Sequence, residues 1–320
     1  MLSKHIQTII TPDKTPKNNE FIHTIQVLTL DLLVSRGMLI ADREHCQHVL
    51  STLNYYRLSG YWFPLFDQKT GQFKDGTRFT DIVAYYEFDE QLRSWLFAGL
   101  SKIETSIRAL LGYELGKIHP HIHLSVNHLN PRASQVARSR KNTKRFTNYE
   151  IWYTRYLNAI KSSHEVFVQH HLEHYKGKLP IWVAVEIMDW GLLSHLHAIC
   201  PEKTRKTIAN RLNLTSPQLE SWLKSLNIVR NIVAHHARVY NRVFEIKPKF
   251  PKDGLWSAAQ IKPHKLFAII VMVYYLHTKL KLPDFEPIDD LFERFPKSAA
   301  EMEVFMGVPK NWKTLLSQIK

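Results

Sequence analysis

Cysteine is nearly absent from this chain, which holds only Cys46 and Cys200 and no C-x-x-C pair. That scarcity excludes a disulfide-stabilised scaffold and leads us to expect a reducing compartment. Glycine is also scarce, with 11 residues in 320, which favours helices over turn-rich β architecture. The longest apolar run covers residues 266–276, well short of the roughly 20 residues needed to cross a bilayer. No signal-peptide core opens the sequence, so we expect a soluble, cytoplasmic protein with no membrane-spanning segment.

Acidic residues are outnumbered, because 29 Asp and Glu stand against 43 Lys and Arg and give a formal net charge of +14. A field of this sign attracts polyanions, so nucleic acid or an anionic membrane surface is the expected class of partner. Charge alone does not decide between these two, or between DNA and RNA. Hydrophobic residues at 44% and charged residues at 22% indicate a folded globular chain of one or two domains.

Apolar residues recur at helical spacing through most of the chain, whereas the sequence contains no internal repeat and no sustained strand alternation. We expect helices at residues 21–37, 41–53, 80–116, 150–174, 180–199, 202–213, 216–239 and 264–281. The predicted class is therefore all-α. The expected domains are a loose arm at 1–20, a helical domain at 21–245, and a C-terminal helical extension at 246–320 that packs on the same body.

Several polar groups lie within or between these predicted helices. Residues 54–66 hold six aromatics and predict a packed core, with Arg57 either stacked among the rings or directed at an anion. Glu104 and Arg108 stand at i,i+4, where a modest surface ion pair is the simplest interpretation. Residues 131–149 contain no acidic residue and form a loop that is either simply solvated or suited to phosphate contacts. The candidates for RNA contact in this loop are Arg138, Arg140, Lys141, Lys144 and Arg145.

The segment after residue 215 predicts the helix with the most informative polar face. Ser216 is the expected N-cap and Pro217 the first helical residue, and the apolar pattern continues to about Val239 or beyond. At roughly 100° per residue, one polar stripe forms opposite the apolar side. Its members are Asn227, Asn231, His235, Arg238 and Arg242. Arg230 stands beside the stripe, whereas His236 falls on the apolar side, where a packed or supporting role is expected.

The stripe carries residue types that suit phosphodiester cleavage. A histidine titrates near neutrality and can pass a proton to or from a ribose hydroxyl or a leaving oxygen. Arginines hold the phosphate and offset charge in the transition state, and attack by a 2′-hydroxyl on its own phosphate needs RNA but no metal. The spacing alone is weak evidence, because a solvated basic face gives the same pattern. Arg43 and His48 repeat the Arg-x4-His spacing, for example.

A set of ordered blocks goes well beyond this spacing. The blocks are Ser35-Arg36-Gly37-Met38, Tyr55-Tyr56-Arg57-Leu58-Ser59-Gly60-Tyr61, Tyr86-Glu87-Phe88-Asp89 with Leu92-Arg93, Ile103-Glu104 with Ile107-Arg108, Pro180-Ile181-Trp182, Glu186, Gly191-Leu192-Leu193-Ser194, the run from Val229 to Arg238, and Asn241-Arg242. In this order, over about residues 25–245, the chain resembles the Abi-like family of bacterial abortive-infection proteins (the AbiD and AbiF type), which is placed in the HEPN superfamily.

The resemblance implies an HEPN-like helical bundle and a metal-independent endoribonuclease without a cofactor. It assigns the signature of an Arg, a polar residue and a His to Arg230, Asn231 and His235, with His236 in support. Since the catalytic groove of such proteins usually lies between two domains, one signature per chain implies a homodimer. The resemblance also implies phage defence, toxin–antitoxin behaviour and, for some members, a bound small structured RNA.

Two other functions remain open from the residues. In the first, the basic helix docks an RNA partner, such as a small structured RNA, without cutting it. In the second, the histidine clusters at residues 119–123 and 170–171 bind zinc. We disfavour zinc, because the sequence lacks cysteine pairs and an H-E-x-x-H run, and we expect these histidines on the surface. The sequence therefore predicts no metal site.

Overall fold

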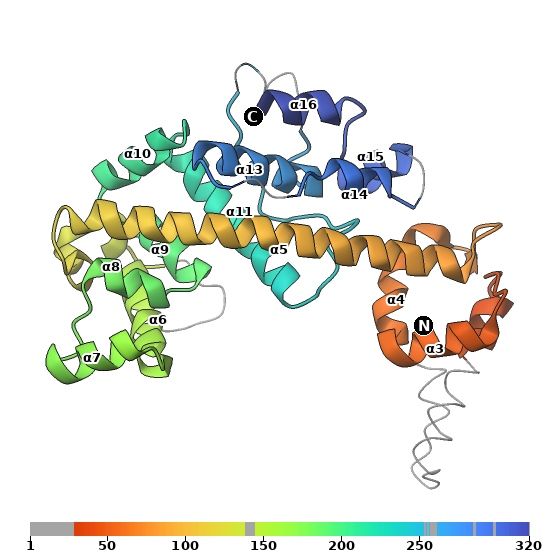
Figure 1. Ribbon diagram of the computed structural model, residues 1–320, viewed down its shortest axis with the longest axis horizontal. Helices are drawn as coiled ribbons and strands as arrows, with labels where there is room; N and C mark the ends of the chain where they lie inside the picture. The colour runs from red at the N-terminus through yellow and green to blue at the C-terminus, as the bar shows by residue number, and fades with distance from the viewer. Residues whose placement is uncertain are drawn as a thin grey trace, which may run out of the picture. The chain divides into compact units, whose positions relative to one another are not determined.

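The computed structural model describes residues 29–137, 145–252, 254, 256, 261–283, 286–296 and 299–319. Helices dominate these residues, and the one sheet among them is a two-stranded hairpin, so the predicted all-α class is confirmed (Figure 1). The chain divides into two compact units, residues 1–88 and 89–320, and the boundary falls inside helix α5 (Phe79–Gly116). The predicted division into 21–245 and 246–320 stays a prediction, and the arm at 1–20 lies outside the described residues.

The N-terminal unit is built from short elements. Its described elements are a helical segment at residues 29–35, α3 (Arg43–Leu53), α4 (Tyr55–Trp62), the 3-10 turn η1 (Phe63–Leu65), and the antiparallel strands β1 (Phe66–Asp67) and β2 (Gln72–Phe73). Asn54 separates α3 from α4 with a left-handed φ of 58°, and its side chain accepts a hydrogen bond from the Tyr56 N–H. An N-cap asparagine satisfies a backbone donor that the first helical turn leaves unpaired, so α4 begins directly after α3.

The aromatic run at residues 54–66 is only partly a core. Tyr61 and Trp62 are buried, and Trp62 meets Phe73 of β2 edge to face, as expected for aromatic packing. Tyr56 and Phe63, by contrast, are exposed. Arg57 lies on α4 with an exposed side chain, so it belongs to the surface of this unit and not to its aromatic core.

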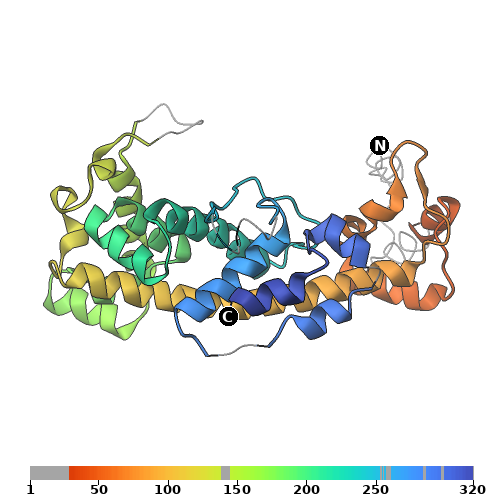
Figure 2. The same ribbon diagram turned by 90° about the horizontal axis from the view of Figure 1, so that it is seen from above.

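The second unit packs around the part of α5 that follows Phe88. Helices α9 (Trp190–Ile199) and α13 (Leu266–Lys279) both pack against α11 (Ser216–Ala234). Helix α13 lies beside α5 in Figures 1 and 2. The His277 ring bonds to the Gly99 carbonyl of α5, and the rings of Trp95 on α5 and Tyr274 on α13 are in contact. Residues 266–277 of α13 are all buried, which confirms the prediction that this apolar run is an interior helix.

The remaining elements complete this unit. They are η2 (Ile122–Leu124), η3 (Val126–His128), η4 (Pro131–Ser134), α6 (Asn148–Ser162), α7 (Val166–His174), α8 (Ile181–Ala184), η5 (Val185–Ile187), α10 (Glu202–Arg211), α14 (Asp289–Glu293), α15 (Ala299–Met306) and α16 (Trp312–Ile319). The predicted helices at 150–174 and 180–199 are each divided in two. The divisions fall at Ser163 and Met188, which have extended backbone angles that no helix contains. The apolar spacing continues across both residues and therefore did not predict these breaks.

Buried ion pairs fix the N-terminal half of α11 against its neighbours. Glu220 of α11 accepts hydrogen bonds from Arg132 at 2.8 Å and from Arg205 of α10 at 2.7 Å. Burial alone would raise the pKa of Glu220, but hydrogen bonds and charge from Arg132 and Lys224 outweigh it and bring that pKa to about 2. The carboxylate is therefore ionised and joins η4, α10 and α11 at one point.

Of the histidines expected on the surface, some are exposed and one is buried. His123 is wrongly predicted, because it is fully buried and its Nε2 contacts the Tyr156 hydroxyl at 3.3 Å. Burial lowers the pKa of His123 to about 3, so this ring is neutral and packed. His119 and His170 are exposed. No group of three or more His, Cys, Asp or Glu is arranged for a metal ion within the described ranges.

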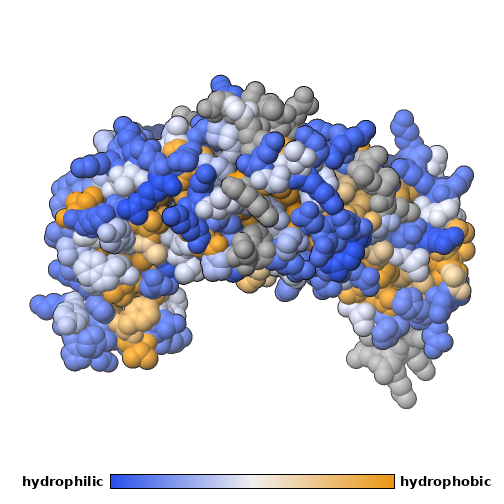
Figure 3. Space-filling model, turned by 45° about the horizontal axis from the view of Figure 1, so that its top comes forward, coloured by the Kyte–Doolittle hydropathy of each residue, from blue (hydrophilic) through white to orange (hydrophobic). Residues whose placement is uncertain are grey.

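Most of the surface visible in Figure 3 is hydrophilic, with apolar side chains gathered in patches. Helix α7 contributes one such patch, since Val166, Leu172 and Tyr175 just beyond its end are exposed by 83%, 41% and 57%. Across the described residues, every helix is too short or too polar to span a bilayer.

Candidate functional site

The end of α11 carries the candidate site, and it differs from the predicted helix. The N-cap is Thr215 and not Ser216, so the helix begins one residue earlier than predicted. Thr215 forms a reciprocal capping box with Gln218. It ends at Ala234, with His235 as C-cap, so the predicted continuation to about Val239 is wrong.

A specific hydrogen-bond pattern terminates the helix. His236 has a left-handed φ of 53°, its N–H donates to Val233, and the Ala237 N–H donates to Ile232 at 2.9 Å. Both bonds satisfy carbonyls that the last turn leaves unpaired, in the arrangement that usually contains glycine at the left-handed position. Residues 234–237 contain no glycine or proline, so no local pattern predicts that the helix ends here. The side chain of His236 is exposed, and its predicted place on the apolar side is wrong.

Asn231 and His235 remain on one face despite the earlier helix end. The His235 N–H donates to the Asn231 carbonyl at 3.1 Å, as in the preceding helical turn. Both side chains are exposed, and the imidazole of His235 makes no hydrogen bond to any residue that the structure describes. An imidazole in this position is accessible to a ligand in solvent, as the sequence interpretation requires.

Arg230 is anchored by an acidic residue of α5, Glu104, which sequence reasoning did not include in the site. Arg230 Nε lies 3.3 Å from Glu104 Oε2, and Arg108 Nη2 lies 3.2 Å from Glu104 Oε1. The same Arg108 nitrogen donates to the Met188 carbonyl at 3.1 Å. Glu104 is only 8% exposed, so the expected surface pair is wrong. The blocks Ile103-Glu104 and Ile107-Arg108 in the family resemblance were the available signal.

The segment after His235 is held by a second buried carboxylate. Asp89 and Arg93, one turn apart on α5, form an ion pair in which both side chains are almost completely buried. Asp89 also accepts hydrogen bonds from the backbone N–H groups of Val239 and Tyr240, the latter at 2.6 Å. Because these bonds fix the chain four and five residues after His235, they determine where Arg238 and Arg242 are placed.

Arg238 and Arg242 therefore lie on a turn and not on the helical stripe predicted for them. Arg242 is exposed, and its Nη1 donates to the Arg238 carbonyl at 3.2 Å. Arg238 is half-buried, and its Nη1 is buried without a hydrogen-bond partner among the described residues. A buried cationic donor of this kind gains from an anion, because an unmade hydrogen bond is costly.

The other predicted RNA contacts stay predictions. Arg57 belongs to the N-terminal unit, and Arg145 is exposed just before α6. The remaining basic residues of that loop lie outside the described residues; they are Arg138, Arg140, Lys141 and Lys144.

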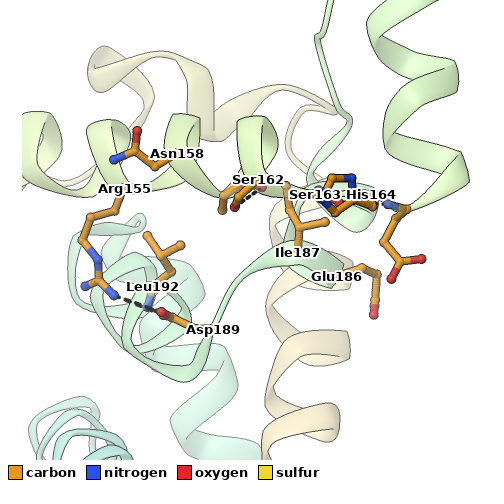
Figure 4. A pocket seen from close by; sticks show the side chains of 11 residues that line it. Arg155, Asn158, Ser162, Ser163, His164, Glu186, Ile187, Asp189 and Leu192 are labelled. Carbon is orange, nitrogen blue, oxygen red and sulfur yellow. Dashed lines mark hydrogen bonds and ion pairs between the residues drawn. The ribbon is translucent and has the colours of Figure 1, made fainter.

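A separate pocket of about 740 Å³ lies between α6 and the segment that leads into α9. In Figure 4, Arg155 extends from α6 towards Asp189, to which it is paired at 3.2 Å, while Glu186 and His164 lie at the other end. Glu165 lines the same pocket, whose lining therefore holds three carboxylates and one arginine. This charge balance does not suit a phosphate backbone. The pocket is nevertheless linked to Arg230, because the carbonyl of Met188, which lies between Glu186 and Asp189 in sequence, accepts a hydrogen bond from Arg108, and Arg108 shares Glu104 with Arg230.

The all-α fold and the exposed Asn and His beside an anchored Arg define a helical protein with a solvent-facing basic site. Residues 48–241, more than half of the chain, match the family model described as Abi-like protein. The chain therefore belongs to the Abi-like family, which ties it to abortive infection, a form of defence against phage. No curated protein and no solved structure matches it.

Proposed function

We propose that this protein is a metal-independent endoribonuclease of the HEPN superfamily that acts in phage defence. The observation that carries the proposal is the end of α11, where His235 and Asn231 are exposed on one face beside Arg230, whose Nε is anchored to the buried Glu104. Membership of the Abi-like family supports the defence role.

In the proposed reaction the ribose 2′-hydroxyl attacks the adjacent phosphorus, and the bond from phosphorus to the 5′-oxygen breaks. His235 accepts the 2′-hydroxyl proton or donates a proton to the leaving 5′-oxygen, and a second proton carrier performs the other step. The products are a 2′,3′-cyclic phosphate and a 5′-hydroxyl end. Proton transfer by a positioned side chain contributes about 10²–10⁴-fold to such a rate.

Arg230 and Arg238 stabilise the negative charge that develops on the phosphate oxygens. Arg230 uses only Nε towards Glu104, and its side chain is 32% exposed, so its terminal nitrogens face an incoming phosphate. Arg238 is half-buried, and its guanidinium adds positive charge in the segment that follows His235. Preorganised donors of this type do not have to reorganise during the reaction, which is why they accelerate it. Asn231 orients the substrate or His235 from the last helical turn.

A homodimer completes this proposal. With one Arg230–His235 pair per chain, a second copy supplies the second proton carrier across a shared groove. The remaining RNA contacts come from the exposed arginines and the basic loop, and a small structured RNA bound there restrains the enzyme.

The test compares purified wild-type protein with the His235→Ala variant on total RNA in EDTA, and the RNA ends are then analysed. We expect new 5′-hydroxyl ends with the wild type and their loss with the variant, while the circular dichroism spectrum is unchanged because the side chain is exposed. Full activity of the variant contradicts the catalytic assignment. Binding without any cleavage, weakened steeply by salt, favours an RNA-docking protein instead.

A further inference from the structure

A second, smaller pocket lies beside the predicted RNA site, where residues 242–246 cross α11 and α13. Its volume is about 340 Å³. Its floor is formed by three buried residues, which are Ser225 of α11, Ile269 of α13 and Phe244 of the crossing segment. Two exposed residues of that segment, Arg242 and Glu245, stand at its rim. A pocket of this size has room for one planar ring system, with apolar surface below and two opposite charges above.

Hydrogen bonds on both sides hold the pocket open before any ligand arrives. The Phe244 N–H donates to the His264 carbonyl at 2.9 Å. Further along, the Lys249 N–H donates to the Ser221 hydroxyl at 2.8 Å, and Trp222 Nε1 donates to the Lys249 carbonyl at 2.9 Å. Since the crossing segment is fixed to α11 at these points, a ligand does not have to order it, which favours affinity.

The pocket lies on the same face of α11 as the imidazole. Its wall residue Ile228 precedes His235 by seven positions, which is nearly two whole helical turns, so both point in about the same direction. The rise along the axis over that interval is about 10 Å. An extended RNA strand covers this distance within a few nucleotides, and Arg242 stands at the rim of the pocket.

The chemistry of the rim selects among bases. Ile228, Val243 and Ile246 offer apolar surface for the faces of a ring. The Glu245 carboxylate accepts two parallel hydrogen bonds from adjacent donors, and guanine is the RNA base with two adjacent donors on its Watson–Crick edge, N1–H and the 2-amino group. Arg242 donates to the O6 and N7 acceptors of the same base, the commonest specific contact of arginine with guanine.

We propose that this pocket binds a guanine base of the RNA, next to the site where His235 acts. The inference rests on the proposed function for its substrate class, but it concerns recognition and not catalysis. Bidentate contacts to base edges discriminate between bases, so about a tenfold preference for guanine is expected.

The test measures binding in the His235→Ala background, where cleavage does not interfere. The probes are labelled 12-residue oligouridines with one central guanosine, adenosine, cytidine or inosine, and the readout is fluorescence anisotropy. We expect guanosine to bind about tenfold more tightly than adenosine or cytidine, and inosine, which lacks the 2-amino group, to fall between them. Glu245→Gln removes most of this preference, whereas Glu173→Gln, an exposed glutamate on α7, leaves it intact.

The outcomes separate this inference from the proposed nuclease. Equal binding of all bases, a preference for cytosine, or a guanine preference that survives Glu245→Gln overturns the pocket assignment, whether or not the wild type cuts RNA. If the guanine preference is present and depends on Glu245 but the wild type makes no 5′-hydroxyl ends, the pocket stands and the nuclease proposal fails. If none of the probes binds, the pocket assignment fails, and the analysis of RNA ends alone decides the nuclease proposal.

Discussion

The same Arg-x4-His spacing occurs in two regions of this molecule, on α3 from Arg43 to His48 and on α11 from Arg230 to His235. On α3 both residues lie within an uninterrupted helix. Arg43 pairs with Asp31, whose side chain is 57% exposed. On α11 the histidine caps the helix, and the arginine pairs with a glutamate whose side chain is only 10% exposed.

The comparison shows that spacing does not make a site. An ion pair in full solvent contributes about 0–1 kcal/mol and leaves both side chains mobile. A buried carboxylate holds its arginine in one place, because an unpaired charge in the interior is far more costly. The motif on α3 thus serves as an internal control for the motif on α11, and each prediction below contrasts matched residues from the two regions where the chain offers them.

The largest difference is expected between the two aspartates. Asp89→Asn removes the charge opposite the buried Arg93 and weakens the contacts to Val239 and Tyr240. We expect the free energy of unfolding to fall by about 3–5 kcal/mol, because removing one charge of a buried ion pair is strongly destabilising. Asp31→Asn is expected to cost about 1 kcal/mol or less. Urea unfolding of both variants measures the difference, and equal losses contradict the distinction.

The two arginines provide the next contrast. Arg230→Ala removes a donor that we place on the transition-state phosphate, and loss of one such donor costs about 10²–10³-fold in rate. Arg43→Ala leaves the rate unchanged, since Arg43 contacts the exposed Asp31. Initial rates on a labelled RNA in EDTA compare them. A comparable loss in both variants means that charge in general, and not the site on α11, drives the reaction.

Buried and exposed histidines differ in their response to acid. His197 of α9 is fully buried, and burial, followed by the charge of Arg205, lowers its pKa to about 4. Its folded pKa lies below the unfolded value, so above about pH 6.5 neither state is protonated, and as pH falls below that only the unfolded chain takes up the proton. Stability is therefore lost between about pH 6.5 and pH 4, with about 2 kcal/mol lost at pH 5.

The substitution His197→Leu tests this linkage. Leucine does not titrate, so we expect the variant's unfolding free energy to fall by about 2 kcal/mol less than that of the wild type between pH 7.5 and pH 5. His48→Leu, on the surface of α3, is the control and shows no such gain. Chemical denaturation at the two pH values measures both. Parallel pH curves for wild type and His197→Leu count against a neutral buried ring.

The smallest effect is expected at Glu104, which acts only through Arg230. Glu104→Gln keeps the shape of the side chain but loses the charge that holds Arg230 and Arg108. We expect about a tenfold lower cleavage rate, corresponding to about 1.4 kcal/mol. In an Arg230→Ala background the same change has no further effect on the rate, as in a double-mutant cycle of coupled residues. An equal further loss there identifies a general structural role instead.

Part of the fold was predictable from local patterns. The long apolar stripe of α5 predicted residues 80–116, and the structure has the helix at Phe79–Gly116. The interior helix predicted at residues 264–281 is α13. These elements were predictable because helix periodicity is written into neighbouring residues. The breaks at Ser163 and Met188 were missed, since extended residues there keep the apolar spacing around them.

For the candidate site, the sequence by itself determined that Arg230 and Asn231 lie on a helix with His235 one turn further on, that the chain is strongly basic, and that its ordered blocks are those of the Abi-like family. Only the tertiary structure decided where that helix stops and which acids hold it. Glu104 meets Arg230 across 126 residues, and Asp89 meets Val239 across 150. Contacts over such separations depend on how helices pack and on which charges become buried, and no spacing of neighbouring residues encodes that.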